Sequence, residues 1–118
     1  MKAVKFFLAL FFVFALTLNA QQVQTGTFVF DSTVKGYSFD KDSGERTVQI
    51  EVAFKKSFDA KPEILLSVTS IDADKEKNLR YEIKSMVVSR DGFVISARTW
   101  SDSKIYSIGG TWMAITSK

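Results

Sequence analysis

Apolar and polar residues alternate along most of the chain, with the period of two that is typical of β-strands. The clearest run covers residues 46–54, where Val48, Ile50, Val52 and Phe54 are separated by Thr47, Gln49, Glu51 and Ala53. The same alternation predicts strands at 64–71, 81–87 and 93–100. A first strand is predicted at 23–30, and a last region contains runs at 105–106 and 112–115 that Gly109-Gly110 separates.

Turn residues bound these runs at Ser57 to Pro62, at the charged segment Asp72 to Asn78 and at the hairpin sequence Arg90-Asp91-Gly92. No segment has a convincing helical period. About six short strands with antiparallel turns predict an all-β fold, a six-stranded antiparallel β-sandwich. An up-and-down barrel is a weaker alternative, because a barrel that encloses a ligand needs more strands and a longer chain.

The first twenty residues have the organisation of a secretory signal peptide. Lys2 and Lys5 precede an apolar run at 6–18, and the small residue Ala20 ends the segment. This run is shorter than the ~20 apolar residues that span a bilayer, so we predict cleavage after Ala20 rather than a membrane span. Residues 1–20 are then the signal peptide, residues 21–118 form the mature domain, and the protein is secreted to the extracellular space.

Removal of Lys2 and Lys5 lowers the net charge from +3 to about +1. The mature domain also has no periodic cluster of basic residues, so nucleic acid is an unfavourable partner. The sequence contains no cysteine, which excludes disulfides as a source of stability. A well-packed core or oligomerisation must stabilise the domain instead.

The sequence also contains no histidine, and without His or Cys it lacks the commonest general base, nucleophile partners and soft metal ligands. Asp72, Asp74 and Glu76 alternate with lysines and lack the glycine and the terminal glutamate of a calcium loop, so they indicate a solvated loop. We therefore predict no metal site, no cofactor and no enzyme activity. A hydrolase that uses two carboxylates is a minor alternative that no residue pattern supports.

Aromatic and planar hydrogen-bonding residues stand near the predicted strand ends, at Arg80, Trp100, Tyr106 and Trp112. An aromatic ring can pack on the C–H face of a pyranose, and a guanidinium or carboxylate can bind its vicinal hydroxyls. Trp112 lies in an apolar run and is expected in the core. Trp100 adjoins the polar turn 101–104 and is expected to be less buried.

Several of these segments match the H-type lectin family, which includes snail agglutinins and the C-terminal domain of the discoidins. The mature chain resembles the family in Phe54 with the Phe58-x-x-x-Pro62 turn, the strand at 63–72, Asn78-Leu79-Arg80, Gly92-Phe93, and the segments 99–107 and 112–115. The resemblance implies a six-stranded antiparallel β-sandwich that forms trimers, or hexamers of two trimers, through its sheets. It also implies binding of glycans with terminal galactose or N-acetylgalactosamine near the subunit junctions, in recognition or cell adhesion.

The resemblance assigns carbohydrate binding to Arg80, Trp100 and Tyr106. The family also uses an acidic residue from an early loop. Counting back without gaps places this position at Ser43, so we choose the neighbouring Asp42, with Asp40 as an alternative.

Ser101 follows the tryptophan, where snail lectins often have a polar ring, so Ser101 is a shorter candidate contact and weakens the case for an N-acetyl preference. An alternative function is therefore an oligomeric structural or coat protein that has the same fold and a decayed sugar site.

Overall fold

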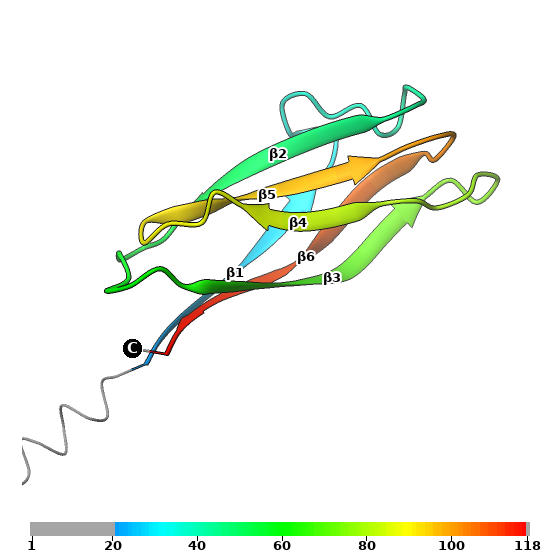
Figure 1. Ribbon diagram of the computed structural model, residues 1–118. Helices are drawn as coiled ribbons and strands as arrows, with labels where there is room; N and C mark the ends of the chain where they lie inside the picture. Colours follow the sequence, from blue (N-terminus) through cyan, green and yellow to red (C-terminus); the bar gives the residue numbers. More distant parts are fainter. Residues whose placement is uncertain (1–20, 118) are drawn as a thin grey trace, which may run out of the picture.

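The computed structural model describes residues 21–117, which form six strands and no helix. The strands make two three-stranded antiparallel sheets that pack face to face (Figure 1). One sheet, the β1–β6–β3 sheet, contains β1 (Gln22–Phe30), β6 (Ile105–Thr116) and β3 (Glu63–Ala73) in that order. The other, the β2–β5–β4 sheet, contains β2 (Arg46–Ala53), β5 (Gly92–Thr99) and β4 (Glu82–Met86). The predicted six-stranded antiparallel β-sandwich is confirmed.

The signal peptide predicted at residues 1–20 lies outside the described residues, so its cleavage stays a prediction. Strands and loops account for all of residues 21–117, and this part of the chain contains no helix that is long and apolar enough to cross a membrane.

The alternating pattern creates the core because successive residues of a strand face opposite sides of the sheet. In β5, Phe93, Ile95 and Ala97 are buried between the two sheets. Trp112 of β6 is only 8% exposed, and its ring centroid lies 5.4 Å from that of Phe93 and 5.9 Å from that of Phe54. The prediction that Trp112 belongs to the core is confirmed.

Three connections between the sheets lie at one end of the sandwich, which we call the loop end (Figure 1). They are residues 31–45, 74–81 and 100–104, whereas residues 54–62 and 87–91 connect strands at the far end. Backbone hydrogen bonds join the three connections of the loop end. The Gly44 N–H donates to the Ser101 carbonyl at 2.9 Å, and the Asp74 N–H donates to the Lys104 carbonyl at 2.9 Å. Segments far apart in the sequence thus form one polar surface.

Gly109 and Gly110 do not interrupt the last strand, so the predicted break at these residues is wrong. β6 is continuous and pairs with β1 on one side and β3 on the other. A Cβ atom on Gly110 would lie 2.0 Å from the Ser67 carbonyl oxygen and 2.7 Å from the Phe28 ring. The glycine is therefore required by the close approach of neighbouring strands, and it does not mark a turn.

β3 is longer than the predicted strand at 64–71. Asp72 pairs with Ser107 and Ala73 with Ile105, so the strand includes the first two residues of the segment predicted as a charged loop. The loop itself begins at Asp74.

We predict that Gly110→Ala lowers the free energy of unfolding by about 1–3 kcal/mol, because the new methyl group must displace a strand backbone or the Phe28 ring. Thr111→Ala is the matched control, since Thr111 is the exposed neighbour on the same strand and its loss should change stability by about 0.5 kcal/mol or less. Urea denaturation measures the free energy of unfolding of both variants. Equal stability of Gly110→Ala and wild type would contradict the close approach of β3 and β6.

Candidate functional site

The loop end brings together four of the five residues that the sequence predicts for carbohydrate binding. Asp42 lies in the 31–45 connection, Arg80 in the 74–81 connection, and Trp100 and Ser101 in the 100–104 connection. Tyr106, the fifth, is the second residue of β6 and belongs to the β1–β6–β3 sheet.

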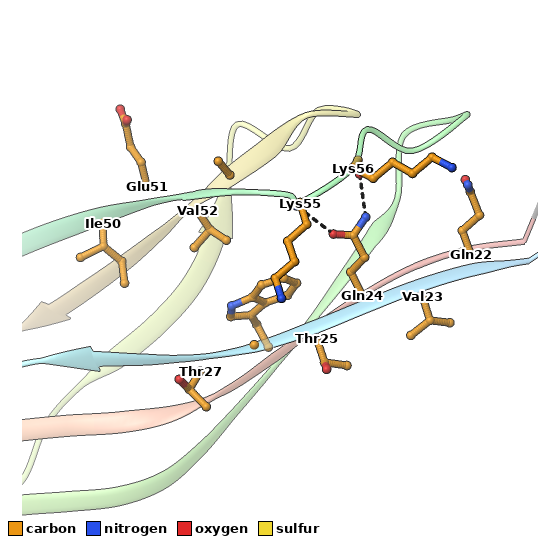
Figure 2. Close-up of a pocket in the computed structure, with 13 residues that line it drawn as sticks. Gln22, Val23, Gln24, Thr25, Thr27, Ile50, Glu51, Val52, Lys55 and Lys56 are labelled. Carbon is orange, nitrogen blue, oxygen red and sulfur yellow. Dashed lines mark hydrogen bonds between the residues drawn. The ribbon is translucent and has the colours of Figure 1, made fainter.

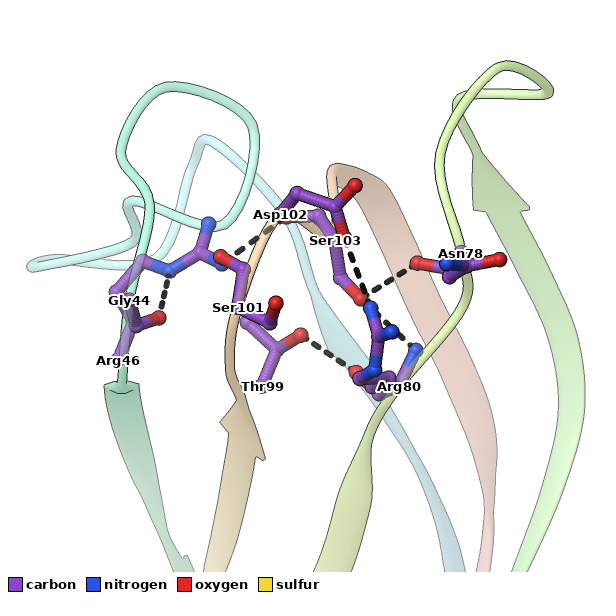
Figure 3. A network of polar contacts seen from close by, with 8 residues as sticks. All are labelled: Gly44, Arg46, Asn78, Arg80, Thr99, Ser101, Asp102 and Ser103. Carbon is purple, nitrogen blue, oxygen red and sulfur yellow. Dashed lines mark hydrogen bonds and ion pairs between the residues drawn. The ribbon is translucent and has the colours of Figure 1, made fainter.

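The backbone of Arg80 is fixed by two buried hydroxyl groups (Figure 3). The Arg80 N–H donates to Ser103 Oγ at 3.0 Å, and the Arg80 carbonyl accepts a hydrogen bond from Thr99 Oγ1. Ser103 Oγ in turn donates to the Asn78 carbonyl at 2.6 Å. Ser103 and Thr99 are both 0% exposed, whereas the Arg80 side chain is 33% exposed. The fold therefore holds the backbone of Arg80 and leaves part of its guanidinium in contact with solvent.

The Arg80 guanidinium forms an ion pair with a residue that the sequence analysis did not select. Arg80 Nη1 lies 2.8 Å from Asp102 Oδ1, and the Asp102 side chain is 51% exposed. Asp102 is an acidic residue in the polar turn after Trp100, and this position in the sequence was sufficient to select it as a candidate site residue. Its pairing with Arg80, however, depends on the contact between two connections and required the fold.

Trp100 is partly buried, in agreement with the expectation that it is more exposed than Trp112. The Arg98 guanidinium carbon lies 4.4 Å from the Trp100 ring centroid, within the range of a cation–π contact. Arg98 also lies 3.6 Å from Glu82 and 3.5 Å from Glu45. These contacts fix Arg98 and give the indole ring of Trp100 a defined neighbour at the end of β5.

Ser101 is exposed and has a φ of 60°, the left-handed conformation that a non-glycine residue rarely adopts. Its carbonyl accepts hydrogen bonds from the Gly44 N–H and, at 3.2 Å, from Arg46 Nη2. The turn is thus held by its backbone, and the hydroxyl group of Ser101 stays at the surface.

Tyr106 lies apart from Arg80 and Trp100 in the hydrogen-bond network of residues 21–117. Its hydroxyl donates to Asp74 Oδ2 at 3.4 Å, and the side chain is 46% exposed. The negative charge of Asp74 raises the pKa of the Tyr106 hydroxyl above its ordinary value, so the hydroxyl remains protonated at neutral pH. The residue therefore lies at the surface with its hydroxyl protonated and directed to Asp74.

The three alternatives for the early-loop acidic position have different environments. Asp42 and Ser43 are exposed, and the Asp42 carbonyl accepts a hydrogen bond from Arg46. Asp40 is partly buried, and its Oδ1 atom has no hydrogen-bond partner within residues 21–117. The exposed carboxylate of Asp42 is thus better placed to meet a ligand than that of Asp40.

Arg46 is a second residue of the loop end that the sequence analysis did not select. It is the first residue of β2 and is only 7% exposed, and its guanidinium points into the loop end (Figure 3). Charged residues at strand ends are usually exposed, so the sequence pattern gave no signal for this one.

A large cleft opens away from the loop end, between the edge strands β1 and β2 (Figure 2). Its lining includes Trp112, Ile50 and Val52, and its rim includes the exposed Lys55 and Lys56. The cleft contains none of the residues predicted to bind carbohydrate.

The Gln24 side chain bridges the rim of this cleft (Figure 2). Its Oε1 accepts a hydrogen bond from the Lys55 N–H at 3.2 Å, and its Nε2 donates to the Lys56 carbonyl at 2.7 Å. The turn that contains the two lysines is thus fixed to β1, because the backbone of the turn bonds to the Gln24 side chain.

The loop end offers donors, acceptors and an aromatic ring for reversible binding. Within residues 21–117, no three His, Cys, Asp or Glu side chains are grouped so that they could hold a metal ion. The chemistry that the described side chains support is hydrogen bonding by Arg80 and Asp102 together with packing on Trp100.

Comparison with known proteins identifies related sequences and folds. Residues 49–115 match the family model of the H-type lectin domain. A curated protein of Fuscovulum blasticum, "ATP synthase subunits region ORF 7", is 27% identical over 94 residues, which cover 80% of this chain and 82% of that protein.

Two solved structures of discoidin II from Dictyostelium discoideum share the fold. One is the wild-type protein, with a TM-score of 0.72 over 83% of this chain, and the other is the native recombinant protein, with a TM-score of 0.71 over 82%. Both are 23% identical to this chain, which spans 37% of the discoidin II chain.

We predict that Ser103→Ala lowers the free energy of unfolding by about 1–3 kcal/mol, because it leaves the Arg80 N–H and the Asn78 carbonyl without their buried partner. Asp102→Ala is the control on the same turn. It removes only an exposed ion pair and should change stability by about 0–1 kcal/mol. Chemical denaturation compares the two variants. If Ser103→Ala is as stable as wild type, Ser103 does not anchor Arg80.

Proposed function

This chain belongs to the H-type lectin domain family, and from that premise we propose that its loop end binds glycans with terminal galactose or N-acetylgalactosamine. The observation that carries the proposal is the exposed ion pair of Arg80 and Asp102, at 2.8 Å, on the same surface as Trp100. The family is one of carbohydrate-binding domains, and the His-free and Cys-free sequence agrees with binding without catalysis.

The Arg80–Asp102 pair matches the chemistry of a sugar diol. A guanidinium only donates hydrogen bonds and a carboxylate only accepts them, so together they can bind two neighbouring hydroxyl groups in one orientation. Each charged hydrogen bond contributes about 1.5–3 kcal/mol, and an aromatic ring adds contact with the apolar C–H face of the sugar. One such site is sufficient for weak binding of a single sugar, near millimolar affinity.

The outer face of the β1–β6–β3 sheet supports the proposal that the protein is a homotrimer or a hexamer of two trimers. Val23, Leu65 and Met113 are 49%, 58% and 37% exposed on this face. Strand pairing places Leu65 opposite Met113, with Val23 opposite Ile115 one pair further along the sheet. A contiguous apolar surface of this kind favours contact with another subunit.

Subunit contact through this sheet would also explain the position of Tyr106. The residue is exposed on β6 and makes its side-chain hydrogen bond with Asp74, in the 74–81 connection. We propose that Tyr106 completes the sugar site of a neighbouring subunit, at the junction between the two.

Secretion is the third part of the proposal. The predicted removal of residues 1–20 would place the mature domain outside the cell, where it can meet the glycans of a cell surface in recognition or adhesion. Several identical sites in one oligomer would then increase the avidity of weak single-site binding.

We predict that Arg80→Ala weakens the binding of free galactose tenfold or more, because about 1.5–3 kcal/mol of charged hydrogen bonding is lost. Trp100→Ala should also weaken binding, whereas Trp100→Phe should retain much of it because an aromatic ring remains. Lys84→Ala is the control, since it removes an exposed positive charge from β4 outside the loop end. NMR titration with monomeric sugar avoids the ~10² to 10⁴-fold avidity that masks such losses on dense glycan surfaces.

The result against the sugar-binding proposal is a folded wild-type oligomer that binds neither galactose, N-acetylgalactosamine nor any arrayed glycan. The protein would then be an oligomeric structural or coat protein with a decayed site.

We predict a trimer, or a multiple of three subunits, in light scattering at micromolar concentration. Leu65→Lys should dissociate it, because the substitution places a charge on the exposed apolar face without disturbing the core. Ala60→Lys, an exposed change in the far-end connection 54–62, should leave the assembly intact. A wild type that is monomeric at every concentration would contradict the shared interface and the role of Tyr106.

A further inference from the structure

We propose that Arg46 is the positioning residue of the sugar site. It holds the 31–45 connection and the 100–104 connection in one geometry and does so without contacting the sugar. The inference rests on the function proposed above, and it adds a residue that determines how well the site is formed.

All five N–H groups of the Arg46 guanidinium donate to backbone carbonyls. Nε donates to Gly44 at 2.8 Å, Nη1 donates to Phe39 at 3.2 Å and to Asp42 at 2.6 Å, and Nη2 donates to Ser101 at 3.2 Å and to Ser103 at 3.0 Å. Three of these carbonyls belong to one connection and two to the other. A single side chain therefore crosslinks two segments that are more than fifty residues apart in the sequence.

Arg46 has no carboxylate partner among residues 21–117, where the ion pairs involve Arg80 and Arg98. Burial of a charge without a counter-ion is unfavourable unless hydrogen bonds compensate for lost hydration. An apolar residue at this position would leave the five carbonyls without their donor. We infer that the role of Arg46 is to fix the relative positions of the five carbonyl groups to which it donates.

The bonds of Arg46 act on three groups of the proposed site, the side chains of Trp100, Asp102 and Arg80. Trp100 and Asp102 flank Ser101, whose carbonyl is bonded to Arg46. Ser103, whose carbonyl is also bonded to Arg46, binds the Arg80 N–H through its hydroxyl group. Release of the 100–104 connection would therefore move the aromatic ring, the carboxylate and the anchor of the guanidinium together.

Arg90 provides a matched control at the far end of the sandwich. Its Nε donates to the Phe58 carbonyl at 2.9 Å, so it also fixes a connection through a backbone carbonyl. The connections it joins, 54–62 and 87–91, carry none of the proposed sugar-binding residues.

The test compares wild type, Arg46→Met, Arg46→Lys and Arg90→Met in the full mature domain. Galactose affinity is measured by NMR titration, well below the lowest melting temperature of the set. We expect Arg46→Met to lose tenfold or more in affinity while it remains folded and oligomeric. Arg46→Lys should be intermediate, because an ammonium group has three donors where the guanidinium has five. Arg90→Met should bind like wild type even if its melting temperature falls.

Amide hydrogen exchange supplies a readout that does not depend on sugar. The Gly44 N–H, bonded to Ser101, and the Ile105 N–H, bonded to Phe39, should exchange faster in Arg46→Met, while the far-end Phe58 N–H, bonded to Arg90, should not.

A folded Arg46→Met that binds galactose like wild type would overturn the proposal, as would unchanged exchange at Gly44 and Ile105. If Arg46→Met does not fold, Arg46→Lys decides by the same two measurements. Failure of wild type to bind any sugar would instead contradict the proposed function, and it would remove the positioning role with it.

Discussion

The packing of β6 against both of its neighbours and against the opposite sheet determines the position of everything else in this molecule. The sequence has no cysteine, so noncovalent packing must hold the sheets together. The Trp112 indole lies against Phe93 and also against β1, where a Cβ atom on Gly26 would be 2.6 Å from the ring. The first residue of β6 is fixed in turn, because the Ile105 N–H donates to Phe39 and its carbonyl accepts from the Tyr37 hydroxyl. The central strand thus connects the core to the loop end.

The site depends on this frame because its residues come from three separate connections. Asp42, Arg80 and Trp100 are distant in the sequence and meet only because each connection crosses between the sheets at the same end. The Arg80 N–H donates to Ser103 Oγ, and Arg46 donates to the carbonyls of Asp42 and of Ser101, the residue after Trp100. The Ser103 and Arg46 side chains are almost fully buried. A rigid sandwich with connections fixed by buried polar groups can present exposed side chains in a constant arrangement, which reduces the entropy lost when a ligand binds.

The sequence predicted the strands and the core position of Trp112 well, because alternation over several residues reports directly on the two faces of a sheet. The prediction of a break at Gly109 and Gly110 failed, because the local sequence does not distinguish a glycine required by close strand packing from a glycine required by a turn. The sequence also missed Arg46, because no local pattern shows that carbonyl groups from two distant connections surround a charged residue at the start of a strand. The contact of Arg80 with Asp102 was inaccessible for the same reason.

The distribution of hydrogen-bond donors among the arginines indicates which one can bind a ligand. Arg46 gives all five N–H groups to backbone carbonyls and has none left for a sugar. Arg98 is placed between the Trp100 ring and the carboxylates of Glu82 and Glu45. Among residues 21–117, the Arg80 side chain is 33% exposed and has one hydrogen-bond partner, Asp102, so its other donors are not used by this part of the chain. Two arginines therefore stabilise the arrangement of the loop end, and the third keeps donors for the sugar hydroxyl groups of the proposed function.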